Sequence, residues 1–312
     1  MLQIPLFLLL ALAQQKPPEA PPPLPGGTTS SGAPAASTLK PGELPAAASP
    51  EARAAWERVC AASVVAGTQR VPVDSFELLL DVRYRGDRAS SDVGEARYRF
   101  KKPALVRVRT TAGKKEVGRG AAGDWLHDDA RQETVLTSVG REYAEDRRQL
   151  DEWSGVGQNF VALTDPRALR IGALEVLKAA PASIPQRLAK RAGELSWLCV
   201  RSPDFRLLGA NPASGIFRAS LGFDPKSGWV ELALVEEDVA DAVLRPTARL
   251  VEMQEPVDTQ GFRTPRKIFV YSVAEGRAPA AFAVPAGMDL FVTSANLRAN
   301  LAPKDFDPPP AR

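Results

Sequence analysis

The residues able to do chemistry are few and scattered along this chain. His127 is the single histidine and stands beside Asp128 and Asp129, but no serine or cysteine partner is identifiable, which disfavours a hydrolase. The acidic run 236–238 has the spacing of no calcium loop, so a solvated hairpin tip is the simpler interpretation. Residues 154–157 (SGVG) predict a flexible turn after a helix and are too short for a phosphate loop. We therefore predict no enzyme, no metal site and no cofactor.

The charge of the chain excludes one class of partner and is unevenly distributed. The 312 residues contain 40 Lys and Arg against 37 Asp and Glu, a formal net charge of +3. A nucleic-acid-binding protein needs a clear cationic excess, so nucleic acid is not expected as a partner. Segment 83–119 nevertheless carries 12 bases and four acids, whereas 228–258 carries two bases and eight acids.

Four arginines dominate the basic segment: Arg97, Arg99, Arg107 and Arg109. Like charges that face each other on neighbouring strands cost free energy, so this density is not a stability device. One interpretation is a patch that contacts anionic head groups or an acidic partner. The other is a solvated face neutralised by Glu77, Asp81 and Glu95.

The N-terminal segments differ in composition from the rest of the chain. Residues 1–13 form an apolar run ending in Ala-Leu-Ala, which predicts a secretory signal peptide cleaved near Ala13. It is shorter than the roughly 20 residues of a membrane-spanning helix. Residues 14–50 are rich in Pro, Ala, Gly and Ser and predict a disordered tether, either a spacer or a tolerated low-complexity tail. Residues 51–312 are enough for one large domain.

Two cysteines, Cys60 and Cys199, fall within that domain. They cannot form a four-thiolate metal site. An oxidising compartment favours a disulfide between them, which we take as the expectation. The alternative is two separately buried thiols that act as small apolar residues.

Most of the domain has the two-residue period of strands that bury one face. A helix is expected at 51–66, and the middle of the chain predicts two more helices, at 141–153 and 166–179. The predicted strands lie at 75–85, 95–100, 105–111, 115–120, 124–129, 133–138, 194–202, 205–210, 215–224, 228–238, 248–256, 266–273 and 280–285. Hairpins are expected at 222–230 and at 258–261. This pattern predicts a mainly β (α+β) fold: a single curved antiparallel sheet with helices packed on its concave side.

Five segments, in order along the chain, resemble motifs of the periplasmic outer-membrane lipoprotein carrier (LolA-like and LolB-like) superfamily. The segments are GEARYRFKKPALVRVRT, GDWLHDDARQETV, LGFDPKSGWVELALVEE, EPVDTQGFRTPRKIFVY and AFAVPAGMDLF. The resemblance implies an incomplete antiparallel β-barrel whose helices form a lid over an apolar cavity for acyl chains. The chain departs from the family in its long tether and in an insertion around 181–195.

Residue types alone indicate that the inward side chains of the first strands form a core. The resemblance implies instead that they line a cavity in which each buried methylene of an acyl chain contributes about 0.8 kcal/mol. The predicted lining consists of Phe76, Leu78, Leu80, Val82, Tyr84, Tyr98, Phe100, Val106 and Val108.

The function implied is that of a non-enzymatic, monomeric carrier in the periplasm, which binds lipoprotein acyl chains or another lipid and touches membranes only peripherally. An envelope protein could be a further partner. The alternative is a periplasmic sensor, regulatory or scaffold domain of the same fold, with a filled core and a protein partner.

Overall fold

The computed structural model describes residues 38–68, 71–85, 94–110, 115–137, 143–207, 216–237, 247–274 and 287–309. These residues all belong to one compact unit, 33–312. The predicted signal peptide, 1–13, and most of the predicted tether lie outside the described ranges.

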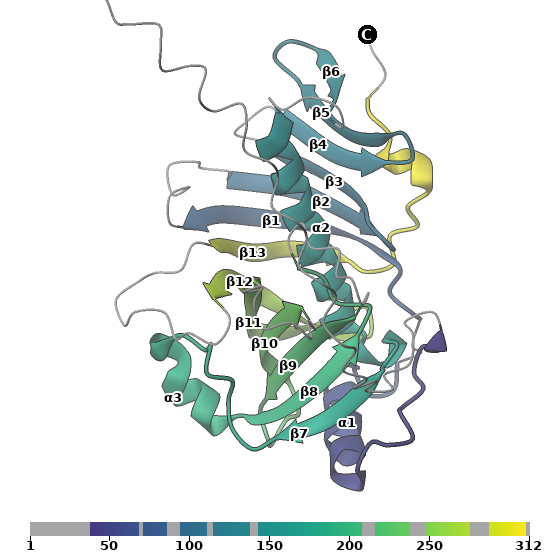
Figure 1. Cartoon of the computed structure of the whole chain (residues 1–312). Helices are drawn as coiled ribbons and strands as arrows, with labels where there is room; N and C mark the ends of the chain where they lie inside the picture. The colour runs from purple at the N-terminus through teal and green to yellow at the C-terminus, as the bar shows by residue number, and fades with distance from the viewer. Residues whose placement is uncertain are drawn as a thin grey trace, which may run out of the picture. The chain divides into compact units, whose positions relative to one another are not determined.

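Within the described ranges, thirteen strands form a single antiparallel sheet (Figure 1). They are β1 (Ser75–Arg85), β2 (Gly94–Lys101), β3 (Leu105–Thr110), β4 (Lys115–Gly120), β5 (Gly123–Asp128), β6 (Glu133–Leu136), β7 (Ala173–Leu177), β8 (Ser196–Ser202), β9 (Phe217–Phe223), β10 (Val230–Glu237), β11 (Thr247–Thr259), β12 (Phe262–Ala274) and β13 (Gly287–Asn296). The spatial order is β6-β5-β4-β3-β2-β1-β13-β12-β11-β10-β9-β8-β7, so β6 and β7 are the two edges and the sheet does not close. The predicted fold class, a curved and incomplete antiparallel barrel with helices, is confirmed.

The hairpins show how local chemistry sets the register of the sheet. The expected turn at 258–261 joins β11 to β12, where Gln260 and Gly261 both have positive φ, 51° and 92°. Turns of this kind match the right-handed twist of the two strands they connect. Asp224 begins the other expected hairpin, between β9 and β10, and its carboxylate accepts N–H groups of Lys226 and Ser227. Both predicted hairpins are confirmed.

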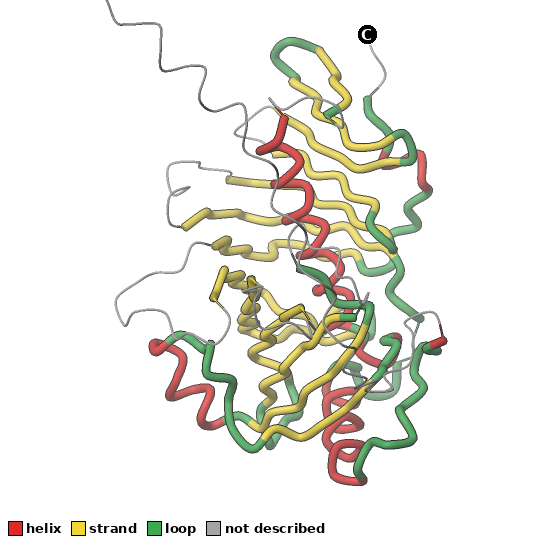
Figure 2. The backbone as a smooth tube through the Cα atoms, viewed as in Figure 1, coloured by secondary structure: helices red, strands yellow, loops and turns green. Residues whose placement is uncertain are grey.

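In the part of the chain that the structure describes, three α-helices accompany the sheet: α1 (Pro50–Ala62), α2 (Ala144–Thr164) and α3 (Gln186–Glu194). Ser49 caps α1, because its hydroxyl accepts the N–H of Ala52 at 3.1 Å and Pro50 occupies the first helical position. Helix α2 runs across the strands on the concave side (Figure 2). None of the helices in the described ranges combines the length and apolarity needed to cross a bilayer.

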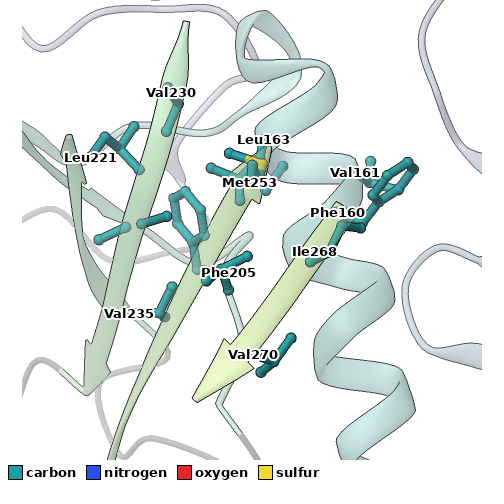
Figure 3. Close-up of a cluster of buried hydrophobic side chains, with 14 of the residues drawn as sticks. Phe160, Val161, Leu163, Phe205, Leu221, Val230, Val235, Met253, Ile268 and Val270 are labelled. Atoms are coloured by element: carbon teal, nitrogen blue, oxygen red, sulfur yellow. The ribbon is translucent and has the colours of Figure 1, made fainter. Parts of the chain in front are cut away.

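The main core lies between the sheet and helices α1 and α2. It includes side chains from β1, β2 and β3 at one end and from β8, β9 and β10 at the other. Figure 3 shows a part of this core. There, Phe160 and Leu163 of α2 lie over the strands that carry Met253, Ile268 and Val270. The concave face is therefore covered along much of its width by α2.

A second apolar cluster lies away from the main core and is built with α3. Its buried members are Ile184, Ala192, Leu195, Trp197, Leu232, Leu234, Ala248, Leu250, Tyr271 and Val273. In β8, Trp197 belongs to this cluster whereas its neighbours Leu198 and Val200 belong to the main core, so the two clusters lie on opposite faces of the strand. The insertion around 181–195 thus supplies a cover for the outer face of the sheet.

Charged side chains also join α3 to the sheet around Tyr271. The Tyr271 ring lies between the guanidinium groups of Arg85 and Arg187, whose Cζ atoms are 4.2 and 4.4 Å from the ring centroid. The Tyr271 hydroxyl donates a hydrogen bond to Glu252 at 2.7 Å, and Arg85 forms an ion pair with Asp289 at 2.7 Å. Burial and the carboxylate of Glu252 raise the pKa of Tyr271 above its ordinary value.

Two predicted elements of the middle segment are wrong. The helix expected at 166–179 is one short 3-10 turn, Pro166–Ala168, followed by the edge strand β7. The turn expected at 154–157 lies inside α2, which extends the predicted helix 141–153 to Thr164. Glycine disfavours a helix locally, so only the packing of α2 on the sheet explains this extension.

Two further expectations meet the structure only in part. Residues 205–207 are described and form no strand, while 208–210 and the strand expected at 280–285 lie outside the described residues. Strand β13, which pairs with β1 and β12, was not among the predicted strands.

The boundary of the folded unit also differs from the prediction. Residues 38–50, expected within the tether, pack against the domain: Gly42 donates its N–H to the carbonyl of Leu169 at 3.0 Å, and Ala48 is buried. Composition describes only the segment itself, whereas these contacts come from residues more than a hundred positions away.

Candidate functional site

The nine residues predicted to line a cavity lie together, buried in the main core beneath α2. Phe76 is their centre. Its ring centroid lies 5.4 Å from those of both Tyr98 and Phe100, and 4.9 Å from that of Phe160 on α2. These aromatic side chains fill the space between the helix and strands β1 to β3.

Helix α2 is held close to β2 at Gly157. A Cβ atom on Gly157 would lie 2.0 Å from the Tyr98 hydroxyl and 2.4 Å from the Phe100 ring, so only glycine fits. The Tyr98 hydroxyl donates a hydrogen bond to the carbonyl oxygen of Trp153 at 2.6 Å. Burial of this hydroxyl raises the pKa of Tyr98 well above its ordinary value of 10.0.

A crevice lies between α2 and strands β11 and β12. Its walls are mainly apolar: Gly155, Val156, Asn159, Phe160 and Leu163 from α2, and Val251, Met253, Ile268 and Val270 from the strands. Glu152, Arg206 and Arg249 complete the lining. About 480 Å³ of space free of atoms lies between its walls, part of it open to solvent, and only about 30 Å³ can hold the centre of a water-sized sphere. It is an apolar seam that α2 nearly closes.

Strands and helix position these residues by their ordinary periods. Val251 and Met253 are two residues apart on β11, as are Ile268 and Val270 on β12, so all four point to the concave face. Both strands were predicted, and their alternation carries the same signal as that of β1 and β2. The predicted lining lay on the first strands instead, because alternation does not show which part of a face a helix fills.

A short segment after β8 closes one end of the crevice and is fixed to α2. Asn159 Nδ2 donates to the carbonyl of Arg206, and the N–H of Arg206 donates to Asn159 Oδ1, both at 2.9 Å. The preceding residue, Gln158, donates a hydrogen bond from its side-chain amide to the carbonyl of Asp204 at 2.9 Å. The polar face of α2 therefore determines where the backbone of 204–206 lies.

The four arginines of the predicted basic patch each lie within 4 Å of a carboxylate. Arg97 and Arg99 both reach Glu77 on β1, at 3.7 and 2.6 Å. Arg107 pairs with Glu116 at 2.6 Å, and Arg109 with Asp129 at 3.2 Å. Arg97 and Arg109 face each other in the β2–β3 register, as do Arg99 and Arg107. Carboxylates of β1, β4 and the turn after β5 offset the repulsion. Glu77 was an expected partner, whereas Glu116 and Asp129 were not.

The remaining residues considered for catalysis or metal binding are His127 and the acidic run that begins at Glu236, and both contact neighbouring side chains within the fold. His127 is buried, with Nδ1 2.8 Å from the Thr134 hydroxyl and Nε2 3.3 Å from Asp129. Glu236 is buried and pairs with Arg218 at 2.8 Å. Among the described residues, no cluster of three or more His, Cys, Asp or Glu side chains could hold a metal ion.

The predicted disulfide is wrong: Cys60 and Cys199 are both buried thiols and are not joined. Cys60 belongs to the main core together with Leu198 and Val200 of β8. Cys199 lies between these two residues on the strand, so its side chain points to the opposite face. The sheet itself separates the two thiols.

The chain is similar to two solved structures of low identity. One is a LolA superfamily protein from Nitrosomonas europaea, which is 14% identical with a TM-score of 0.39. The other, from Vibrio parahaemolyticus, is a domain named for outer-membrane lipoprotein sorting, 8% identical with a TM-score of 0.36. Each match covers 82% of this chain and 97% of the other. No family model and no curated protein matches the chain. The fold assignment rests on the sheet topology described above.

Proposed function

We propose that this protein is a non-enzymatic carrier, exported to the periplasm, that binds lipoprotein acyl chains or another lipid between α2 and the sheet. The observation that carries the proposal is the apolar crevice over β11 and β12. The motif resemblance to the lipoprotein carrier superfamily supports it, and so does the unclosed sheet, whose apolar face is covered by helices rather than by further strands.

Entry of a chain into the crevice requires α2 to move relative to β11 and β12, because the present opening admits little more than one water. The two sides of the helix differ in how closely their backbone is packed against neighbouring atoms. At Gly157 the helix is in close contact with Tyr98 and Phe100, whereas a Cβ on Gly155 would meet its nearest atoms only at 3.9 Å. A tilt of α2 about its contact with β2 would therefore widen the crevice. Each methylene that enters would contribute about 0.8 kcal/mol.

The first test is extraction of lipid from protein purified from cells, followed by mass spectrometry. Stoichiometric lipid is the expected result. A fluorescent acyl probe titrated into the delipidated protein then measures binding directly. Absence of lipid together with absence of probe binding would contradict the carrier function.

A substitution pair locates the binding. Gly155→Leu places an apolar side chain in the crevice and improves helix propensity, so it is expected to weaken probe binding at least about tenfold without unfolding the protein. Gly193→Leu on α3 is the control, because a Cβ there meets nothing within 4 Å. Equal binding by both variants would show that the chain does not bind in the crevice.

The alternative function is a regulatory or scaffold domain of the periplasm with a filled core and a protein partner. The specific observation in its favour is the aromatic packing beneath α2 over β1 to β3. Its contact surface would include Arg97 and Arg109, whose side chains are 53% and 59% exposed despite their ion pairs. Capture of one defined envelope protein by the lipid-free domain, lost in Arg97→Glu, would favour this function over the carrier.

A further inference from the structure

Arg206 is the residue of the crevice that the packing of the fold does not account for. Its backbone is fixed to α2 by the two hydrogen bonds with Asn159, so its side chain begins at a defined point on the crevice wall. Such a fixed backbone limits the entropy that the side chain must lose when it binds a ligand.

The guanidinium of Arg206 is partly buried without an ion pair among the described residues. The carboxylate of Asp204 is held instead by Arg170, at 2.6 Å to the guanidinium and 2.7 Å to the backbone N–H. Arg206 has only a 3.3 Å contact with the carbonyl of Pro203 and a position 5.6 Å from the centroid of the Phe217 ring. None of its nitrogens is among the buried polar atoms that lack a partner, so its remaining donors are accessible from the crevice or solvent and can bind an anion.

The electrostatics of the site agree with this geometry. Loss of hydration is the main cause that lowers the pKa of Arg206, and the nearby charge of Arg170 lowers it further, while Asp204 opposes both. Arg249 on β11 also lines the crevice, and its Nη1 donates to the hydroxyl of Ser272. The lining thus contains two arginines, Arg206 and Arg249, and one acid, Glu152.

We infer that the ligand of this crevice is an anionic amphiphile whose carboxylate or phosphate head binds Arg206, with Arg249 nearby, while its chain lies along Met253, Ile268 and Val270. The inference rests on the proposed carrier function and adds the charge of the head group. A guanidinium suits both anions, because its donors match two oxygens of either group.

The test compares ligands that share a chain and differ in the head. Oleate, oleyl phosphate and oleyl alcohol are titrated into the delipidated protein, and inorganic phosphate alone serves as the anion without a chain. We expect the wild type to bind oleate, oleyl phosphate or both with an affinity at least about tenfold higher than its affinity for oleyl alcohol. Its affinity for inorganic phosphate should be at least about tenfold lower than its affinity for these anionic ligands. Arg206→Gln is expected to remove most of the difference in affinity between the anionic ligands and the alcohol. Its affinity for the alcohol should equal that of the wild type.

Two further variants sharpen the assignment to Arg206. Arg206→Lys keeps the charge and is expected to retain part of the preference. Arg83→Gln removes an arginine whose side chain is 66% exposed and paired with Asp81, so its binding should equal that of the wild type.

The possible outcomes separate this inference from the function on which it rests. Equal binding of oleate, oleyl phosphate and oleyl alcohol by the wild type would overturn the inference and leave the carrier function standing. Binding of none of the three would remove both. Inorganic phosphate bound as tightly as oleyl phosphate would show a simple anion site and also overturn the inference. If Arg206→Gln fails to fold, the wild-type comparison still decides whether an anionic head is preferred, and Arg206→Lys decides the assignment.

Discussion

Tyr98 on β2 donates its hydroxyl hydrogen to the carbonyl oxygen of Trp153 on α2, across 2.6 Å in a fully buried setting. The two rings lie 5.0 Å apart between centroids. This pair joins the middle of α2 to the middle of β2 by a polar and an apolar contact at once. It fixes α2 on the strands β1 to β3.

The buried hydroxyl of Tyr98 predicts a loss of stability at alkaline pH. Its folded pKa is raised above the unfolded value of about 10, so the unfolded chain gives up this proton first. The stabilising contribution is fully present below about pH 10 and is lost as the pH rises toward the folded pKa, by up to about 1.4 kcal/mol per pH unit. Urea unfolding between about pH 8 and pH 11 measures it. Tyr98→Phe is expected to be about 1 kcal/mol less stable at neutral pH but to decline less steeply. Parallel curves for the two proteins would contradict this assignment.

The two helix glycines of α2 are expected to respond oppositely to alanine. Gly157→Ala forces a methyl group into Tyr98 and Phe100, and we expect destabilisation of about 1–3 kcal/mol. The Cβ atom introduced by Gly155→Ala would lie 3.9 Å from its nearest neighbours, which is ordinary contact. This variant is expected to be more stable by up to about 1 kcal/mol, because alanine favours a helix more than glycine does. Thermal and urea unfolding of both variants provide the measurement, and a stabilised Gly157→Ala would refute the close approach of helix and strand.

Asn159 is expected to stabilise the segment that carries Arg206. Asn159→Ala leaves both the N–H and the carbonyl of Arg206 without their partner, which we expect to cost about 1–3 kcal/mol. Hydrogen exchange at the Arg206 amide should accelerate in this variant. Gln158→Ala is the control, because it removes a single hydrogen bond, to Asp204, and leaves the Arg206 amide bonded. Equal exchange at Arg206 in the two variants would show that Asn159 does not hold the segment.

The separate thiols predict that reducing agents leave the stability unchanged. A disulfide between Cys60 and Cys199 would close a long loop and contribute on the order of 4–5 kcal/mol. The unfolding midpoint is therefore expected to be the same with and without dithiothreitol. A thiol reagent should modify both cysteines in urea and neither in the native protein, since both are buried. A midpoint that falls on reduction would instead indicate a disulfide.

Periodicity located most strands because the two-residue alternation is a local property of a half-buried sheet. It found the inward set around Phe76 and the arginines opposite them. The motif resemblance added the incomplete closure of the barrel, but the order of the strands in the sheet came only from the structure. The local prediction was wrong at 154–157, where two glycines that favour a turn lie inside α2. It also failed at 166–179, where an apolar stripe of helical spacing belongs to a short turn and an edge strand.

Residue types and their two-residue alternation are enough to predict a mainly antiparallel sheet with an apolar concave face and few groups able to do chemistry. They do not predict where that face is filled and where it borders a crevice, because this depends on which distant segment packs against it. Alternation sets the direction of a side chain but not what lies opposite it. The position of α2 determines that Phe76 is packed while Met253 borders a crevice. The pairing of Asp204 with Arg170 likewise determines that Arg206 is left with unused donors at its wall.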